Sequence, residues 1–353
     1  MARGLKLRDR DAVLSKEKII FRVLGYEHPP GGVICDAEYA PSTLFVSKNP
    51  KAPRKTFGGE KYYKFYEHEG IEFVKNRFPN YRVKFEPLGK ELVGLNKNQI
   101  SQVRLPKEKL ERVFYGERSD ELIKALRKAL VEIFNRSKLR MDDFGVFGSI
   151  LHDFYHPKYS DLDFTVYGRK AVLELRGLLK EFYKEGAFIA NEFEVMPFKD
   201  KWKFKRLSLK EFFAHQREKL IYAVLIDRSF GRRIKVEFEP VRGDDELPRR
   251  EGKVERIRRA GWASAIGKVV DDSESYFMPS IYRVEVRKVV KGAPAARVDK
   301  IVSYVEEFRM QAEEGDKIYV EGNLEEVTVN GEKAYQITLT YGERYYEQAL
   351  KKI

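Results

Sequence analysis

Cysteine is almost absent from this 353-residue chain, which contains Cys35 alone. One cysteine cannot form an internal disulfide, and it cannot supply the several thiolates of a cysteine zinc site. The five histidines show no paired spacing with it. The sequence therefore predicts no structural zinc, and we expect Cys35 to be a small buried apolar residue.

Long apolar stretches are absent as well. Nowhere do about eighteen apolar residues follow one another, as a membrane-spanning helix requires. The opening residues, MARGLKLRDRDAVLSKEK, carry charges where a signal peptide has an apolar run. We expect a cytoplasmic protein with no membrane partner.

Apolar and aromatic residues are nevertheless plentiful, at 42% and 13% of the chain. This supply offsets the ordering entropy of compact domains, and the length favours two or three of them. We predict an α+β protein with an N-terminal accessory domain at residues 1–105, a central domain at 106–245 and a C-terminal domain at 246–353.

The charge balance is basic, with 68 Lys and Arg against 55 Asp and Glu, a formal net charge of +13. Such a balance favours polyanionic partners such as nucleic acid or nucleotides. A heavily charged solvated surface explains it about as well, because both signs are abundant. Charge alone therefore leaves both alternatives open.

The N-terminal segment reads as α+β or β-rich. Short β-type runs lie at 18–24, 44–47 and 81–87, separated by loops rich in Pro and Gly. Residues 61–81 mix aromatics with Lys and Arg, which suits either base stacking with phosphate contact or packing in a core.

The central segment predicts alternating helices and strands. Ser119 and Asp120 form a capping signal before a helix that reaches about Asn135. A second helix is expected at 170–184, with strands at 144–147, 160–166, 220–226 and 233–241, the last two paired directly. Residues 199–219 are densely basic with embedded aromatics, which suits a solvated helix or a nucleic-acid groove.

The C-terminal segment predicts mostly strands, after a charged linker or hinge at 242–261. Asn330-Gly331 is a strong hairpin signal. The strands are expected at 264–270, 282–289, 317–321, 326–329 and 334–340, with a helix-like stretch at 298–306. Five short strands suggest a small barrel of the OB type, a class that often binds single-stranded nucleic acid.

The segment that carries chemistry is FGVFGSILHDFYHPKYSDLDFTV, residues 144–166. Gly148 and Ser149 stand at a strand-to-helix junction, where free N–H groups and a serine hydroxyl suit a triphosphate. Asp161 and Asp163 lie two residues apart on a strand and so share one face. Hard cations such as Mg²⁺ prefer carboxylate oxygen, so this pair suits a divalent metal in nucleotidyl transfer.

A third carboxylate is expected from a neighbouring strand, to complete a second metal or to activate the attacking hydroxyl. Glu237 and Glu239 share one face of the run KVEFEP. We favour Glu237 because Val236 and Phe238 on either side of it are core residues. Glu239 remains the alternative.

The order of an apolar strand, Gly148-Ser149, a short helix and Asp161-Leu162-Asp163 resembles the signature of the DNA polymerase beta type nucleotidyltransferase superfamily. The resemblance covers about residues 119–241 and implies a mixed sheet with flanking helices. It implies Mg²⁺ or Mn²⁺ on Asp161 and Asp163, and an NTP held at Gly148-Ser149.

The function expected from these features is transfer of a nucleoside monophosphate from an NTP to a hydroxyl, most readily on RNA or another nucleic acid. Two alternatives stay open: a protein or small-molecule acceptor, and a catalytically idle scaffold that binds nucleic acid. We expect His152 and His156 to be surface or half-buried residues. Nearby cations that could meet a triphosphate, or be simply solvated, are Lys158, Arg169 and Lys170.

Overall fold

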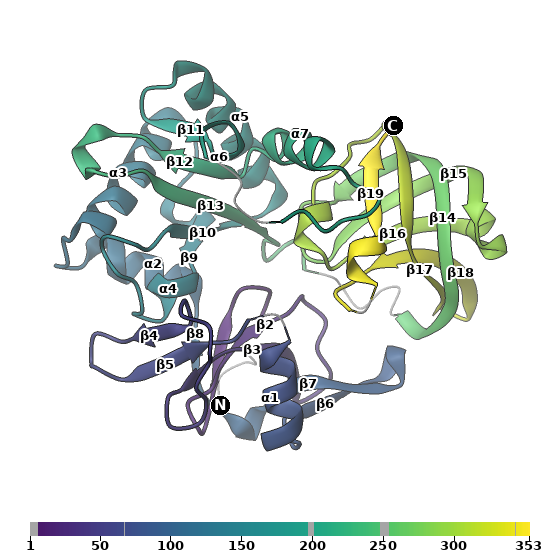
Figure 1. The fold of residues 1–353 in the computed structure, drawn as a ribbon, viewed down its shortest axis with the longest axis horizontal. Coiled ribbons are helices and arrows are strands. Elements are labelled where there is room, and N and C mark those ends of the chain that lie inside the picture. Colours follow the sequence, from purple (N-terminus) through teal and green to yellow (C-terminus); the bar gives the residue numbers. More distant parts are fainter. Residues whose placement is uncertain (1–5, 67, 197–200, 248–253, 343) are drawn as a thin grey trace. The chain divides into compact units, whose positions relative to one another are not determined.

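The computed structural model describes residues 6–66, 68–196, 201–247, 254–342 and 344–353. The chain is an α+β protein with three β-sheets, which confirms the predicted class (Figure 1). It divides into two compact units. The first unit contains Met1–Phe85, Lys90–Ile189 and Ala223–Leu247, and the second contains Glu86–Gly89, Ala190–Tyr222 and Pro248–Ile353. Most of the predicted N-terminal and central segments thus share one unit.

The N-terminal part of the first unit is an eight-stranded sheet. The strands are β1 Ala12–Ser15, β2 Ile20–Val23, β3 Gly32–Pro41, β4 Pro53–Lys55, β5 Lys61–Lys64, β6 Arg82–Phe85, β7 Lys90–Asn96 and β8 Ile100–Arg104. Their order is β4-β5-β3-β2-β1-β8, with β7 paired to both β3 and β6. The predicted strands at 18–24 and 81–87 are confirmed.

Two other expectations for this part of the chain are decided by local structure. The expected strand at 44–47 is wrong: the amides of Leu44 and Phe45 both donate to the carbonyl of Pro41, which makes a turn. The aromatic stretch at 61–81 forms β5 and α1 (Glu69–Arg77), and its Tyr62, Phe65 and Phe73 are buried. Those three rings therefore serve the core.

The second sheet has the order β11-β12-β13-β10-β9. Its strands are β9 Phe144–Val146, β10 Leu162–Tyr167, β11 Ile189–Asn191, β12 Tyr222–Leu225 and β13 Ile234–Val241. Figure 1 shows helices beside it, among them α2 Pro106–Tyr115, α3 Glu121–Arg136 and α5 Arg169–Glu185. The two helices, the strands and the direct β12–β13 pairing expected here are confirmed.

Alternation along two neighbouring strands of this sheet separates a core face from a polar face. Leu162, Phe164, Val236 and Phe238 are buried, and the rings of Phe164 and Phe238 stack with centroids 5.5 Å apart. Leu162 and Phe164 thus point into the core. Successive strand residues point to opposite faces, so the acidic residues between these apolar ones lie together on the other face.

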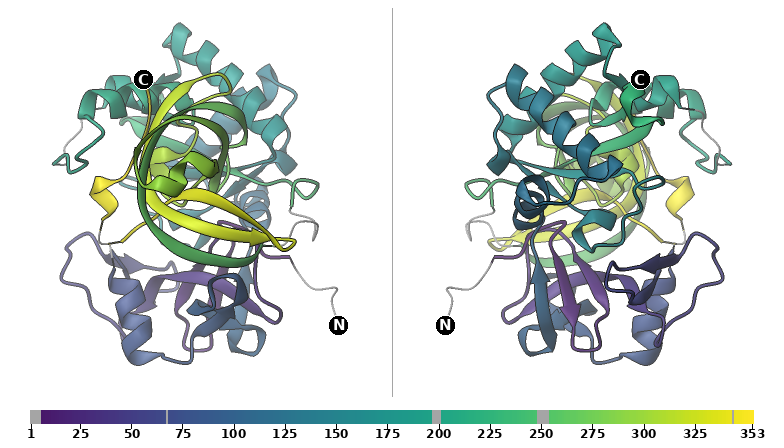
Figure 2. Two further views of the ribbon diagram at one scale, coloured as in Figure 1. Left: turned by 90° about the vertical axis from the view of Figure 1, so that its right-hand side faces the viewer. Right: turned by 90° about the vertical axis from the view of Figure 1, so that its left-hand side faces the viewer.

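The second unit is built on a six-stranded sheet that curls strongly, drawn in green and yellow in Figure 2. Pairing runs β14-β15-β16-β18-β17-β19, and β14 also pairs with β17. The strands are β14 Val254–Glu274, β15 Ser280–Lys291, β16 Val298–Ser303, β17 Lys317–Val329, β18 Glu332–Leu339 and β19 Ala349–Lys352.

Several C-terminal expectations need correction. The helix-like stretch expected at 298–306 is wrong: residues 298–303 form strand β16, which pairs with β15 and β18 on its two sides and buries Val298, Ile301 and Val302. The runs 317–321 and 326–329 form one continuous strand, and the part of the expected linker from 254 to 261 is already β14. The hairpin at Asn330-Gly331 is confirmed: both residues have positive φ between the antiparallel β17 and β18.

Helix α7 (Leu209–Lys219) follows a basic segment in the second unit. Ser208 caps it by accepting a hydrogen bond from the Glu211 amide, and Phe212 packs into the core of the curled sheet. Residues 199–200 of the basic stretch lie outside the described residues. Across the described ranges, no helix is long and apolar enough to cross a membrane.

The N-cap of α3 provides a test of this fold. The Asp120 carboxylate accepts from the amides of Leu122 and Ile123, and its other oxygen accepts from the hydroxyl of Tyr155, 2.7 Å away. We predict that Asp120→Ala lowers the free energy of unfolding of the first unit by about 1–2 kcal/mol in urea titrations. Asp120→Asn, which keeps an acceptor, should lose less, and an equal loss would contradict the capping role.

Candidate functional site

The acidic residues of β10 and β13 meet in one row. The two strands are parallel, with Asp163 directly opposite Glu237 and Thr165 opposite Glu239. Residues in register on adjacent strands point to the same face. Asp163 and Glu237 are half-buried, and Asp161, one residue before β10, is exposed. The structure thus places Asp163 and Glu237 on one face of the sheet, and Asp161 close enough for its charge to act on Asp163.

The Gly148 turn closes directly over Asp163. The amide of Phe147 donates to the backbone carbonyl of Asp163, 2.9 Å away, which ties the end of β9 to β10. Gly148 has φ of +60°, and a Cβ there would lie 2.2 Å from Oδ2 of Asp163. Both the conformation and the close approach therefore require glycine at this position.

The helix expected after Gly148 is a single turn. Helix α4 spans Gly148–Leu151, and the carbonyl of Ser149 accepts from the amide of Phe154. One turn adds little dipole, so the short helix itself offers no strong field for an anion. The half-buried Ser149 stands beside the glycine that contacts Asp163.

The loop before Asp161 is held by an arginine from the segment that leads into β13. Arg232, which precedes β13, donates to the carbonyl of Pro157 at 3.1 Å and to that of Ser160 at 2.6 Å. The Ser160 hydroxyl in turn accepts from the amide of His156. These bonds tie the approach of Asp161 to the approach of Glu237, and the pattern of the sequence gave no sign of this role for Arg232.

Burial and like charge act together on Asp163. Loss of solvent raises the pKa of its carboxyl to about 7, and the charge of Asp161 adds to the rise. The positive charges of Lys64 and Arg10 oppose that rise without cancelling it. A further cation beside Asp163 would stabilise the ionised form of its carboxyl.

Lys64 reaches this region from the N-terminal sheet. It ends β5, and its ammonium lies 6.0 Å from the ring centroids of both Tyr39 and Tyr66. Its charge acts on Asp163 across about a hundred residues of sequence. Sequence reasoning missed Lys64 because nothing in the local pattern links it to the acidic pair.

Glu239, the alternative third carboxylate, has a structural partner. It is fully buried and forms an ion pair with Arg10, with 2.7 Å between the guanidinium nitrogen and the carboxylate oxygen. The Arg10 guanidinium also lies 5.1 Å from the ring centroid of Phe147. Asp9 lies 3.7 Å from the same guanidinium, and burial raises its pKa. Glu239 therefore anchors the N-terminal segment beneath the site, and Glu237 is half-buried directly opposite Asp163.

The expectation for His152 is wrong. It is 2% exposed, packs against Tyr39 and lies with Nδ1 3.1 Å from the Arg104 guanidinium. Burial, together with the charge of Arg104, lowers its pKa well below the usual range, so the ring is neutral. His156 is exposed, as expected.

The three nearby cations differ in exposure. Lys158 and Lys170 are exposed, and Arg169 is half-buried at the start of α5, where its amide donates to Glu246. Cys35 is buried, as predicted.

The geometry of the described side chains bears on metal binding. In the described part of the chain, no three Asp, Glu, His or Cys side chains are already gathered closely enough to hold a metal. The donors nonetheless fit one, because Asp163 lies in a cradle that a Cβ on Gly148 would fill, and its raised pKa marks a carboxylate short of positive charge. Oxygen donors of this kind suit Mg²⁺ or Mn²⁺.

A cavity of about 250 Å³ lies elsewhere in the first unit. It is formed between α2, the start of α3 and the turn after α4, and none of Asp161, Asp163 or Glu237 lines it. The polar and charged residues that line it are Lys109, Arg112, Glu117, Arg118, Asp153 and Tyr155.

The raised pKa of Asp163 predicts how stability depends on pH. In the unfolded chain the carboxyl ionises near pH 4, and in the folded protein near 7. The folded state therefore loses stability as pH rises from 4 to 7, because ionisation is harder there than in the unfolded chain. Asp163→Asn should stabilise the metal-free protein by roughly 4 kcal/mol above pH 7 and by almost nothing at pH 4.

Denaturant unfolding in EDTA at pH 4, 6 and 8 measures this gain. Asp142→Asn is the matched control, because Asp142 is exposed in the turn before β9. A gain that is the same at every pH would contradict the burial argument.

Comparison with known proteins assigns the chain to no described family. No protein-family model matches it, and no solved structure matches it. It is similar to "Uncharacterized protein MJ1086" of Methanocaldococcus jannaschii, with 24% identity over 335 residues that cover 94% of each chain. The similarity therefore extends through both compact units.

Proposed function

We propose that this chain is a metal-dependent nucleotidyltransferase that moves a nucleoside monophosphate from an NTP to a hydroxyl group, with RNA or another nucleic acid as acceptor. The observation that carries the proposal is the in-register pairing of Asp163 with Glu237, beside Gly148 and two residues after Asp161. The motif's resemblance to DNA polymerase beta type nucleotidyltransferases supports the same reading.

In this proposal Asp161, Asp163 and Glu237 hold Mg²⁺ or Mn²⁺. A metal held by these carboxylates would supply positive charge to the phosphates and help to orient them for in-line displacement. The acceptor hydroxyl oxygen forms a bond to the α-phosphorus, and the bond from that phosphorus to the bridging oxygen of the β-phosphate breaks. Pyrophosphate leaves, and Glu237 takes the hydroxyl proton.

Other residues position the reactants. Ser149 offers a hydroxyl to a phosphate oxygen at the turn that covers Asp163. Lys64, whose charge already acts on Asp163, supplies positive charge toward the triphosphate. Arg232 keeps the segment before Asp161 in place by its two bonds to backbone carbonyls.

The acceptor preference rests on the second unit. We propose that its curled sheet is a small barrel of the OB type, since the pairings of β14, β15, β16, β18 and β17 return to β14. A module of this type suits an extended nucleic acid better than a small molecule. The net charge of +13 favours the same class of acceptor.

The first prediction from this proposal concerns transfer itself. Purified protein with labelled NTPs, Mg²⁺ or Mn²⁺ and a mixed RNA pool should label the RNA. Asp161→Asn/Asp163→Asn should lower the rate roughly a thousandfold, because the metal's stabilisation is worth several kcal/mol. Asp142→Asn should match the wild type.

The same assay separates the alternatives. Metal-dependent NTP binding without RNA labelling would overturn the acceptor and direct the search to proteins and small hydroxyl compounds. Absence of NTP binding in the wild type would overturn the enzymatic proposal in favour of a scaffold that binds nucleic acid.

The second prediction distinguishes the two glutamates. Glu237→Gln should abolish transfer, because Glu237 stands directly opposite Asp163 in the row of acidic residues. Glu239→Gln breaks a buried ion pair with Arg10 and should cost roughly 3 kcal/mol of stability. Initial rates and urea titrations on both variants check this, and an inactive but stable Glu239→Gln protein would assign the third carboxylate to Glu239.

A further inference from the structure

In the basic segment before α7, in the second unit, buried aromatic side chains alternate with exposed basic ones. Trp202 and Phe204 pack into the core of the curled sheet, and the indole of Trp202 donates to the carbonyl of Leu207 at 2.6 Å. The residues between and beside them are exposed: Lys201, Lys203, Lys205 and Arg206. This extended segment is thus anchored by aromatic rings on one side and presents a row of positive charges on the other.

An aromatic row runs beside these charges. The Tyr341 ring lies 5.1 Å from Tyr345, and Tyr345 lies 4.7 Å from Tyr346, centroid to centroid. The amide of Lys205 donates to the carbonyl of Tyr346 at 2.8 Å, and the Lys203 ammonium is 5.2 Å from the Tyr346 ring. Tyr341 is 54% exposed and Tyr346 37%, so both rings reach solvent. Lys203, Lys205, Tyr341 and Tyr346 are called the Tyr–Lys surface below.

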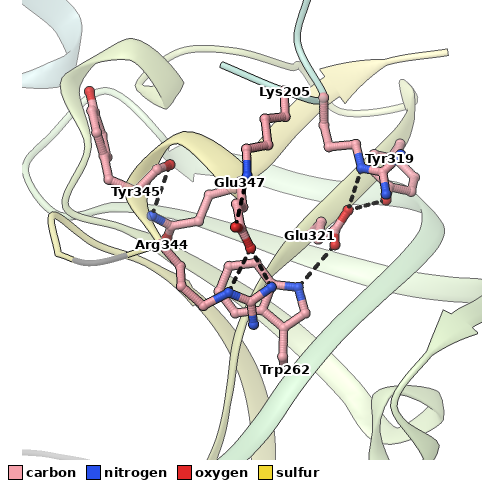
Figure 3. A network of polar contacts seen from close by, with 9 residues as sticks. Lys205, Trp262, Tyr319, Glu321, Arg344, Tyr345 and Glu347 are labelled. Carbon is pink, nitrogen blue, oxygen red and sulfur yellow. Dashed lines mark hydrogen bonds and ion pairs between the residues drawn. The ribbon is translucent and has the colours of Figure 1, made fainter. Parts of the chain in front are cut away.

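Arg344 borders this surface and is held rigidly. Its guanidinium stacks on Trp262, 3.6 Å from the ring centroid, and it shares the Glu347 carboxylate with Lys205 (Figure 3). Figure 3 also shows Glu321 between Trp262 and Tyr319, and it accepts hydrogen bonds from both. Stacking and shared carboxylates fix these side chains in place, which lowers the entropy lost on binding.

Basic side chains outnumber carboxylates among the described residues on and around this surface. Lys201, Lys203, Lys205, Arg206 and Arg344 stand with Glu307, Glu321 and Glu347. Glu307 accepts from the Tyr345 hydroxyl, and that ring therefore has a structural role. Lys203 and Lys205 are the described basic residues that contact Tyr346, one of the two exposed rings.

We propose that the Tyr–Lys surface binds single-stranded nucleic acid. Tyr341 and Tyr346 stack on unpaired bases, and Lys203 and Lys205 contact the phosphates between them. Stacking requires bases that are free of a partner strand, so the occupant is a single strand. The surface lies wholly within the second unit, and this inference holds whether or not the carboxylates of the first unit are catalytic.

The test is fluorescence anisotropy of the full chain with a labelled, unstructured 20-nucleotide RNA over a range of KCl concentrations. Tyr341→Ala/Tyr346→Ala should weaken binding at least tenfold with an unchanged salt slope, because stacking carries no charge. Lys203→Ala/Lys205→Ala should reduce the slope of log K against log salt by about 1.4, or 0.7 for each lost phosphate contact. Lys268→Ala/Lys288→Ala removes two exposed lysines elsewhere in this unit and should bind like the wild type.

Companion variants separate this proposal from misfolding and from the proposed chemistry. Tyr341→Phe/Tyr346→Phe keeps both rings and should retain binding, and melting curves should show all variants folded. Asp161→Asn/Asp163→Asn should bind the RNA normally. If both tyrosine and lysine variants bind like the lysine control, or if duplex RNA binds equally well, the proposal is overturned. Binding of polyglutamate that depends on the same residues, without RNA binding, would assign the surface to an acidic protein instead.

Discussion

The parallel register of β10 with β13 is the constraint on which the candidate site depends. It sets Asp163 against Glu237 and, on the opposite face, stacks Phe164 on Phe238. Because side chains alternate along a strand, slipping one strand by a single residue would carry an acid into the core and an apolar residue onto the site face. The packing of the core therefore enforces the alignment of the carboxylates.

Three other contacts support that alignment. The Gly148 turn lies against the Asp163 carboxylate, Arg232 ties the approach of Asp161 to that of β13, and the Arg10–Glu239 pair anchors the N-terminal segment beneath. Each restrains the backbone around the carboxylates. The result is a half-buried acid whose pKa is raised to about 7, a group that is costly to ionise until a cation lies beside it.

The second unit uses alternation for a different purpose. In the segment that contains Trp202 and Phe204, the aromatic residues enter the core and the lysines between them face solvent. In both units, side chains along an extended segment alternate between the core and the other side. This places acidic residues together in the first unit and basic residues together in the second. Acids beside a proposed metal suit the proposed NTP, and bases beside exposed tyrosines suit the proposed nucleic-acid strand.

Sequence by itself determined the features that rest on local patterns. The capped helix α3, the strands β9 and β10, and the hairpin at Asn330-Gly331 all follow from periodicity and turn chemistry. Long-range partners were decided by tertiary structure, because burial depends on which segments pack together. Residues 298–303 became a strand between two neighbours, His152 was buried, and Glu239 was taken by Arg10. Lys64 came near Asp163 for the same reason: pairing between distant strands, and no local pattern, brought its charge there.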